Sequence, residues 1–267
     1  MNNLNKIPIH DSSLRHSTGQ AIYIDDMPEQ ENLLHGAPLL SKDACGKIIK
    51  INSDKLQDLP FFTKIITAKD IPGENEIGPI KNGEPILADK FYSYLGQPIA
   101  IVLAKTHQEA IYASSLVEIE TDLTTKPILN LDDAYQQKSF LEDPMVLEKG
   151  NIENNMSKSD YKLSGDFEMG GQDHFYLETH VAMTFPGENN EYVVWSSTQH
   201  PTEVQHGVGN VLNIPSAKID SKVRRLGGGF GGKESQATIF AAMSALGAYI
   251  TQKPVKIRLN RHTDMTA

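Results

Sequence analysis

The chain has 267 residues, of which 39% are hydrophobic and 22% charged, a composition typical of a globular protein with one large or two ordinary domains. The formal net charge of −9 excludes a nucleic-acid binder, because phosphate contacts need clustered Lys and Arg. The longest strongly apolar run, residues 99–104, is far shorter than the roughly 20 residues that span a bilayer. Residues 1–6 are polar, unlike a signal peptide, so we expect a cytoplasmic protein with no membrane partner.

From about residue 18 to 125, the sequence predicts short strands separated by turns. Three β-prone runs are bounded by Gly, Pro or Asp: residues 21–24, 47–51 and 63–67. The apolar run 99–104 predicts a buried strand, and Thr106 and Glu109 then have the spacing of a capping box. A helix through about Ser115 and a half-buried or edge strand over 117–120 should follow.

Residues 126–160 change character. Pro, Gly, Asn and Ser punctuate this stretch, which predicts a connecting arm that crosses a surface, with one helical turn around 131–135. The strand signal returns after Tyr161 and is clearest over 191–196, which carries the only tryptophan.

The last hundred residues carry the most regular pattern. Residues 218–226 are strand-like, and residues 227–232 contain five glycines and one phenylalanine. An Ala-rich helix is predicted over 235–250, stopped by Pro254, and a strand over 255–259. The predicted order is strand, loop, helix, strand.

The glycine-rich segment 227–232 can bring backbone N–H groups close to a ligand, because no Cβ intervenes. Such loops form cradles for anions or oxygen atoms when they precede a helix. A tight strand-to-helix turn would need only one or two glycines. The segment therefore predicts a binding loop.

Two nucleotide-binding patterns match this loop by letter. The phosphate-loop pattern GxxxxGK is followed here by Glu234, where a Ser or Thr should ligate magnesium. A carboxylate about 4 Å from a phosphate charge is repelled by roughly 4 kcal/mol at an effective dielectric near 20. The dinucleotide pattern GxGxxG lacks its acid at the end of the next strand, since the first acid there is Asp264. A nucleotide-binding module stays an alternative of another class.

Metal and disulfide chemistry is constrained by residue counts. Cys45 is the only cysteine, so the chain can form no internal disulfide and cannot supply the four ligands of an iron–sulfur cluster. Two histidine pairs are six residues apart and do not align on one helical face: His174 with His180, and His200 with His206. We expect no zinc site.

Residues 227–234, taken whole, resemble the molybdenum-centre loop of the xanthine dehydrogenase and aldehyde oxidase family. Residues 170–179, GGQDHFYLET, are similar to the other signature of that family in this region, as are residues 197–200 and 255–265. Residues 19–28 look like the opening of its hammerhead domain. The resemblance covers nearly the whole chain in the family's order.

The resemblance implies an α+β fold in three parts. A strand-rich hammerhead domain would occupy 1–125, a connecting arm 126–160, and the first part of the molybdenum-cofactor-binding domain 161–267. The remainder of that domain, with the general base, would lie beyond residue 267, so no catalytic set is complete here.

The resemblance also implies roles for four residues. The molybdenum is held by a pterin, and no side chain ligates it directly. Gln172 would donate its amide hydrogen to a metal-bound oxygen, and the backbone of Phe230 and Gly231 would contact the apical oxygen. Glu234 would bind the purine.

Family members that act on purines resemble this chain in having Glu at position 234, whereas aldehyde oxidases typically carry an apolar residue. A Glu in the first turn of a helix would also gain roughly 0.3–1 kcal/mol from the helix dipole.

Neighbouring residues have plainer interpretations. We expect His174 and Glu178 to be structural partners within a strand pair, and Lys233 to face solvent or pair with an acid. The triplet Phe175, Tyr176 and Leu177 is expected in the core.

The implied reaction is the hydroxylation of hypoxanthine and xanthine to urate. Electrons would pass through iron–sulfur clusters and FAD to NAD, all bound by a partner subunit, because Cys45 is alone. The isolated chain is expected to be inactive, to lack the molybdenum cofactor, and to expose apolar faces that favour homo-oligomers. The alternatives are an aldehyde or other N-heterocycle hydroxylase of the same family, and a non-catalytic remnant that only binds partner subunits.

Overall fold

The structure, a computed structural model, describes residues 9–78 and 83–267. Residues 1–6, on which the signal-peptide argument rests, lie outside the described residues. Contacts divide the chain into two units, Met1–Thr125 with His174–Ala267, and Lys126–Asp173. Within the described ranges, no helix is both long and apolar enough to span a bilayer.

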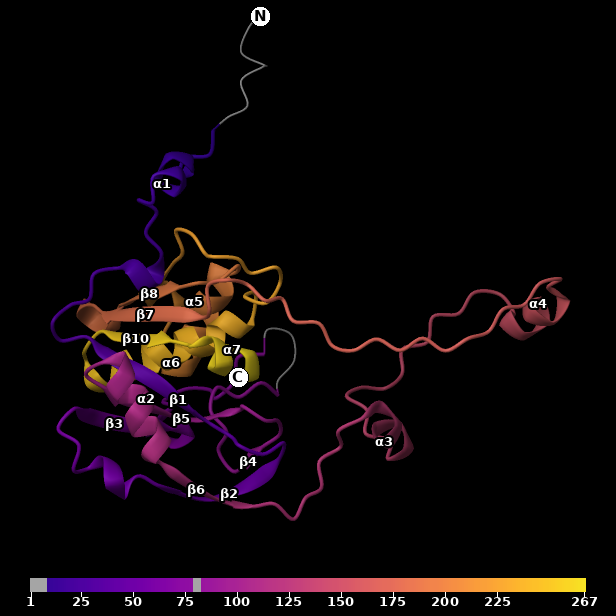
Figure 1. The fold of residues 1–267 in the computed structure, drawn as a ribbon, viewed down its shortest axis with the longest axis horizontal. Helices are drawn as coiled ribbons and strands as arrows, with labels where there is room; N and C mark the ends of the chain where they lie inside the picture. Colours follow the sequence, from indigo (N-terminus) through magenta and orange to yellow (C-terminus); the bar gives the residue numbers. More distant parts are fainter. Residues whose placement is uncertain (1–8, 79–82) are drawn as a thin grey trace, which may run out of the picture. The chain divides into compact units, whose positions relative to one another are not determined.

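A seven-stranded sheet lies at the centre of the first unit (Figure 1), and its strands have the order β3-β5-β1-β10-β7-β8-β9. Its strands are β1 Leu34–Leu40, β3 Phe62–Thr67, β5 Pro98–Ala104, β7 Val181–Pro186, β8 Tyr192–Ser196, β9 Ile219–Lys222 and β10 Val255–Arg258. β1 pairs with β10 in parallel, with Leu34 opposite Val255. Strands from both ends of the chain therefore share one sheet and one core.

A smaller sheet has the order β4-β2-β6, with β2 at Gly46–Asn52, β4 at Phe91–Tyr92 and β6 at Glu118–Asp122. The predicted strands over 47–51, 63–67, 99–104 and 117–120 are confirmed as β2, β3, β5 and the edge strand β6. Every residue of β5 is buried, as its apolar run predicts.

The predicted helix after β5 is confirmed as α2, His107–Leu116. The Thr106 hydroxyl oxygen accepts the N–H of Glu109 at 3.3 Å and donates to the Glu109 carboxylate at 2.9 Å. The cap is therefore present, although the carboxylate accepts a hydroxyl rather than a backbone N–H.

The predicted strand over 21–24 is wrong. The chain turns instead into a short 3-10 helix, Ile24–Asp26, because the Asp26 carboxylate accepts the N–H of Tyr23 at 3.0 Å. Four similar 3-10 turns occur at Asp54–Leu56, Ala68–Asp70, Glu188–Asn190 and Ser216–Lys218, and a short helix, α1, at Ser13–Ser17.

Two helices, α5 Pro201–Leu212 and α6 Gln236–Thr251, pack together, and α6 also lies against β7, β8 and β10 (Figure 1). The predicted order of strand, loop, helix and strand is confirmed as β9, loop, α6 and β10, but β9 ends at Lys222 rather than residue 226. Ser244 of α6 donates its hydroxyl to the carbonyl of Val255 at 2.8 Å and ties the helix to β10. The chain ends in α7, Arg261–Thr266.

The second unit, Lys126–Asp173, holds two short helices, α3 Leu131–Gln136 and α4 Ile152–Lys158. The predicted helical turn around 131–135 is confirmed as α3, whereas α4 was not predicted. Every residue of this unit except Ala134 is exposed. The strand signal after Tyr161 is wrong up to residue 180, since no strand forms there before β7. The boundaries of the three predicted parts stay predictions.

Candidate functional site

The glycine loop forms a tight turn between β9 and α6. The N–H of Gly232 donates to the carbonyl of Gly229 at 2.8 Å, and the two central residues, Phe230 and Gly231, have φ values of 54° and 100°. Two positive φ values in succession are the pattern of a type I′ turn, which disfavours a side chain such as phenylalanine. The Phe230 side chain is nevertheless held there, 75% exposed.

Gln199, just after β8, contacts this turn on both sides. Its Oε1 accepts the N–H groups of Gly231 at 2.9 Å and Lys233 at 3.3 Å. Its own N–H donates to the carbonyl of Lys233 at 2.8 Å. A Cβ added to Gly229 would collide with the Gln199 carboxamide. Position 229 therefore requires a glycine, because the Gln199 side chain occupies the space that a Cβ would need.

Lys233 is fully buried beneath the loop. Its Nζ lies 3.2 Å from Oε2 of Glu178 and 4.7 Å from the centre of the Tyr176 ring. Burial lowers the pKa of Lys233, and the Glu178 carboxylate opposes that shift. Of the two interpretations of Lys233, pairing with an acid is confirmed and exposure to solvent is wrong.

Glu178 and His174 contact the glycine loop rather than each other across a strand pair. Glu178 Oε2 also accepts the N–H of Gly227 at 2.8 Å, and the ring of His174 packs against Gly232. The predicted strand pair is wrong, because residues 174–180 form no strand. The expected core triplet is wrong at two positions: Tyr176 is buried, whereas Phe175 and Leu177 are 66% and 91% exposed.

A second polar cluster lies next to Tyr176. The Tyr176 hydroxyl lies 3.1 Å from Nδ1 of His180, and that nitrogen lies 2.8 Å from Oδ1 of Asp264 in α7. Arg261 donates to the carbonyls of Tyr176 and Leu177 at 2.6 and 2.7 Å. Residues 176–180, which lie beneath the glycine loop, are therefore held by α7.

The pKa of Asp264 is set by two opposing effects. Burial alone would raise it, but hydrogen bonds from the side chain and backbone N–H of His180 outweigh burial and lower it below the ordinary value of 3.8. A lowered carboxyl pKa contributes stability that is present above pH 3.8 and is lost as the pH falls through the folded value.

We therefore expect Asp264→Asn to destabilise the chain at pH 7 by about 1–3 kcal/mol, the cost of unmatched buried groups. The difference from wild type should shrink below pH 4, as wild-type Asp264 itself becomes protonated. Urea unfolding of both proteins from pH 3 to 7 measures this difference. A gap that does not change with pH would show that the Asp264 charge is not involved.

The four predicted site residues fall in different units. Phe230 and Gly231 lie in the glycine loop, and Glu234 follows the loop by two residues. Glu234 is exposed and precedes Ser235, the N-cap of α6, so the interpretation as a residue of the first helical turn is wrong. Gln172 belongs to the second unit, where its Nε2 lies 3.5 Å from the carbonyl of Gly171. The pairing of Gln172 with the loop stays a prediction.

Two backbone groups of the loop, those of Phe230 and Gly231, are predicted to contact an oxygen-rich cofactor, and one of the two N–H groups is available for this contact. Among the described residues, the N–H of the exposed Phe230 has no hydrogen-bond partner, so it is free to donate to an oxygen atom. The N–H of Gly231 already donates to Gln199.

The same contacts argue against the nucleotide alternative. A phosphate loop needs free N–H groups and a lysine that reaches the phosphates. Here the N–H groups of Gly231 and Lys233 are engaged by Gln199, and the Lys233 ammonium is buried against Glu178. The loop is thus poorly arranged for a phosphate.

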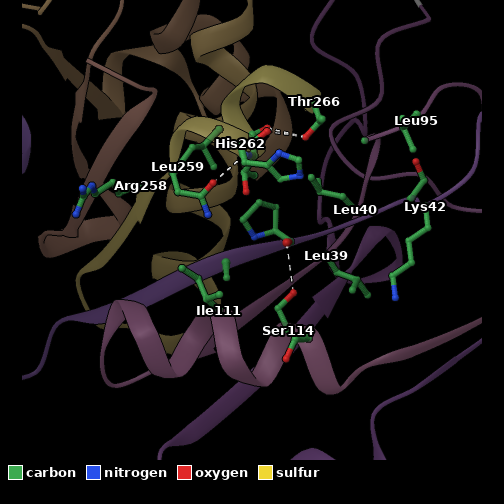
Figure 2. Close-up of a pocket in the computed structure, with 17 residues that line it drawn as sticks. Leu39, Leu40, Lys42, Leu95, Ile111, Ser114, Arg258, Leu259, His262 and Thr266 are labelled. Atoms are coloured by element: carbon green, nitrogen blue, oxygen red, sulfur yellow. Dashed lines mark hydrogen bonds between the residues drawn. The ribbon is translucent and has the colours of Figure 1, made fainter. Parts of the chain in front are cut away.

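A cavity of about 610 Å³ lies elsewhere, between β1, α2 and the start of α7. Figure 2 shows Leu40, Ser114 and His262 among the side chains around it. No residue of the glycine loop lines this cavity. Over 9–78 and 83–267, no group of three or more His, Cys, Asp or Glu could hold a metal ion.

Comparison with known families and proteins gives two consecutive matches. Residues 18–123 match the family described as "Aldehyde oxidase and xanthine dehydrogenase, a/b hammerhead domain", and residues 134–267 match "Molybdopterin cofactor-binding domain". Together they confirm the predicted fold class, a hammerhead domain followed by the start of a molybdenum-cofactor-binding domain.

Curated relatives match almost the whole chain. It is 36% identical to the xanthine dehydrogenase/oxidase of Gallus gallus and 38% identical to aldehyde oxidase 2 of Macaca fascicularis, over 96% of this chain and 19% of each relative. The chain thus spans about a fifth of their length.

Two solved structures share the fold. Quinoline 2-oxidoreductase from Pseudomonas putida 86 superposes with a TM-score of 0.82 at 21% identity, over 96% of this chain and 34% of that one. Aldehyde oxidoreductase from Desulfovibrio gigas superposes with a TM-score of 0.79 at 21% identity, over 96% and 30%.

Proposed function

The chain belongs to the xanthine dehydrogenase and aldehyde oxidase family of molybdenum hydroxylases, and from that premise we propose that it is part of the molybdopterin-binding subunit of a xanthine dehydrogenase. In the complete enzyme, hypoxanthine and xanthine would be hydroxylated to urate, a step of purine catabolism. One observation supports the purine substrate: the carboxylate of Glu234 is exposed two residues after the glycine loop. Among the described residues it has no ion pair or hydrogen bond, so it can accept one from a purine N–H.

The residues of this chain would divide the work between cofactor and substrate. The amide of Gln172 and the N–H of Phe230 would hold the molybdenum–molybdopterin group, which supplies the redox chemistry when bound. The loop around Gly231 would fix the distance between that group and Glu234. Glu234 would hold the purine as charge shifts onto its ring.

The electron acceptors would belong to a partner. Cys45 is the only cysteine of the given sequence, so these 267 residues cannot supply the ligands of an iron–sulfur cluster, and we propose that the clusters, FAD and the NAD site are bound by a partner subunit. We place this assembly in the cytoplasm. The inactivity of the isolated chain, its lack of cofactor and its tendency to form homo-oligomers stay predictions, as does the general base beyond residue 267.

The second candidate is an aldehyde hydroxylase of the same family. The match to aldehyde oxidase 2 of Macaca fascicularis, at 38% identity, is as high as the matches to xanthine dehydrogenases. Identity therefore does not separate the two substrates, and the separation depends on Glu234.

Kinetics of the complete enzyme test the proposal. We expect kcat/KM for xanthine to exceed that for an aromatic aldehyde by at least about 10⁴-fold, the lower end of the discrimination that a site built for hydrogen bonds achieves against a ligand without them. The opposite preference would establish the aldehyde candidate instead.

A further inference from the structure

We propose that Gln199 is the positioning residue of the glycine loop. Its side chain reaches the loop from the segment between β8 and α5, where it accepts two N–H groups on the far side of the turn, those of Gly231 and Lys233. Its backbone N–H adds a third bond, to the carbonyl of Lys233. Three bonds from one residue fix the turn to the segment that follows β8.

The neighbour of Gln199 strengthens this attachment. Thr198 is buried, and its hydroxyl donates to the same Lys233 carbonyl at 3.2 Å while accepting the N–H of His200 at 2.9 Å. The backbone that carries Gln199 is therefore itself held in place. A carboxamide on a fixed backbone is a rigid acceptor for the loop.

The turn needs such support because its conformation is strained. Phe230 has a φ of 54°, a region that costs a non-glycine residue of order 1 kcal/mol or more. A local turn with one internal bond, from Gly232 to Gly229, does not enforce that value by itself. The bonds to Gln199 lie on the C-terminal side of Phe230 and hold its N–H in one orientation.

The inference rests on the proposed function only in its consequence for the enzyme. If Phe230 presents its N–H to the cofactor, Gln199 sets the direction of that N–H without touching cofactor or substrate. Its loss should then lower kcat by a larger factor than it raises the KM for xanthine, because the Glu234 carboxylate itself is retained while the N–H of Phe230 loses its fixed direction.

Hydrogen exchange on the 267-residue chain tests the positioning role without cofactor. We expect Gln199→Met, which removes the acceptor at nearly constant volume, to speed exchange of the amides in 227–234 by at least about tenfold, with α6 unchanged. Gln199→Glu keeps an oxygen acceptor and should restore protection. Gln205→Met is the matched control, because Gln205 donates to the carbonyl of Ile219, away from the loop. Unchanged loop protection in Gln199→Met would overturn the proposal.

A second variant keeps the test decisive if Gln199→Met folds poorly. Gly229→Ala should expel the Gln199 carboxamide and speed exchange of the same amides, because the new Cβ takes its place. The double variant should show no further effect, since both changes break one contact. Additive effects would overturn the proposal. Faster loop exchange without any fall in kcat of the complete enzyme would leave the positioning role intact and count against the proposed function.

Discussion

Replacing Glu178 by Gln should destabilise the chain by about 3 kcal/mol at pH 7, the low end of the range for breaking a buried ion pair. The variant keeps an oxygen that can accept the N–H of Gly227 but leaves the Lys233 ammonium without its counter-charge. Lys233 has no exposed surface, so water cannot replace the carboxylate. The remaining partners, the carbonyl of Thr179 at 3.5 Å and the ring of Tyr176, are weak.

An upper limit on this effect follows from proton release. Lys233 can escape its unpaired charge by deprotonating, which from an ordinary pKa of 10.5 costs about 5 kcal/mol at pH 7. Removing the Glu178 charge takes away the influence that raises the pKa of Lys233, so its folded value falls further. Between that value and 10.5 the unfolded chain binds more protons than the folded one, and stability rises with pH. The difference in free energy of unfolding between wild type and Glu178→Gln should therefore become smaller as the pH approaches 10.

Urea unfolding of the single and double variants measures the effect. Adding Lys233→Met to Glu178→Gln should recover most of the lost free energy of unfolding, because no buried charge is left. Glu118→Gln is the surface control: it breaks the ion pair with Lys55, in which both side chains are more than 60% exposed, and should leave the unfolding midpoint unchanged. A double variant as unstable as the single one would mean that the pair is not energetically coupled.

Elements with a strong local pattern could be predicted from the sequence. The apolar run of β5 and the helical spacing of α6 determine those elements almost alone, because both are buried. β1 was not predicted, since its His, Gly and Pro disfavour a strand, and pairing with β5 and β10 on its two sides overrides that preference. The reverse occurs at 21–24, where a β-prone run is turned by the carboxylate of Asp26.

The candidate site could be predicted only in part. The glycines marked the loop, but what holds the loop comes from residues far away in the sequence: Gln199 is 32 positions from Gly231, and His180 is 84 from Asp264. The hydrophobic periodicity of the sequence cannot predict such contacts, because each contact depends on the order of the strands in the sheet. Lys233 shows the same limit, since its sequence allowed either exposure or pairing and the position of Glu178 decided between them.

Glu234 differs from these supporting residues because it has no partner to stabilise within the described part of the chain. It lies outside α6 and gains little from the helix, and it is exposed beside a loop whose other side chains are almost absent. An unpaired carboxylate at that place costs the fold nothing to replace. Its substitution should therefore separate substrate recognition from stability, which substitutions at Glu178 or Gln199 cannot do.

In the complete enzyme we expect Glu234→Val to lower kcat/KM for xanthine by about 10²–10³-fold, the effect of removing one group that stabilises charge in the transition state. Turnover of an aromatic aldehyde should be kept or increased. An aldehyde has no N–H group for the Glu234 carboxylate, whereas a valine side chain at this position needs no hydrogen-bond donor. The urea midpoint should not change. Glu191→Val, which removes another exposed carboxylate from the same unit, is the matched control and should leave both activities unchanged. Equal losses on both substrates in Glu234→Val would assign Glu234 to the integrity of the loop, and the purine would then have to be recognised by other residues.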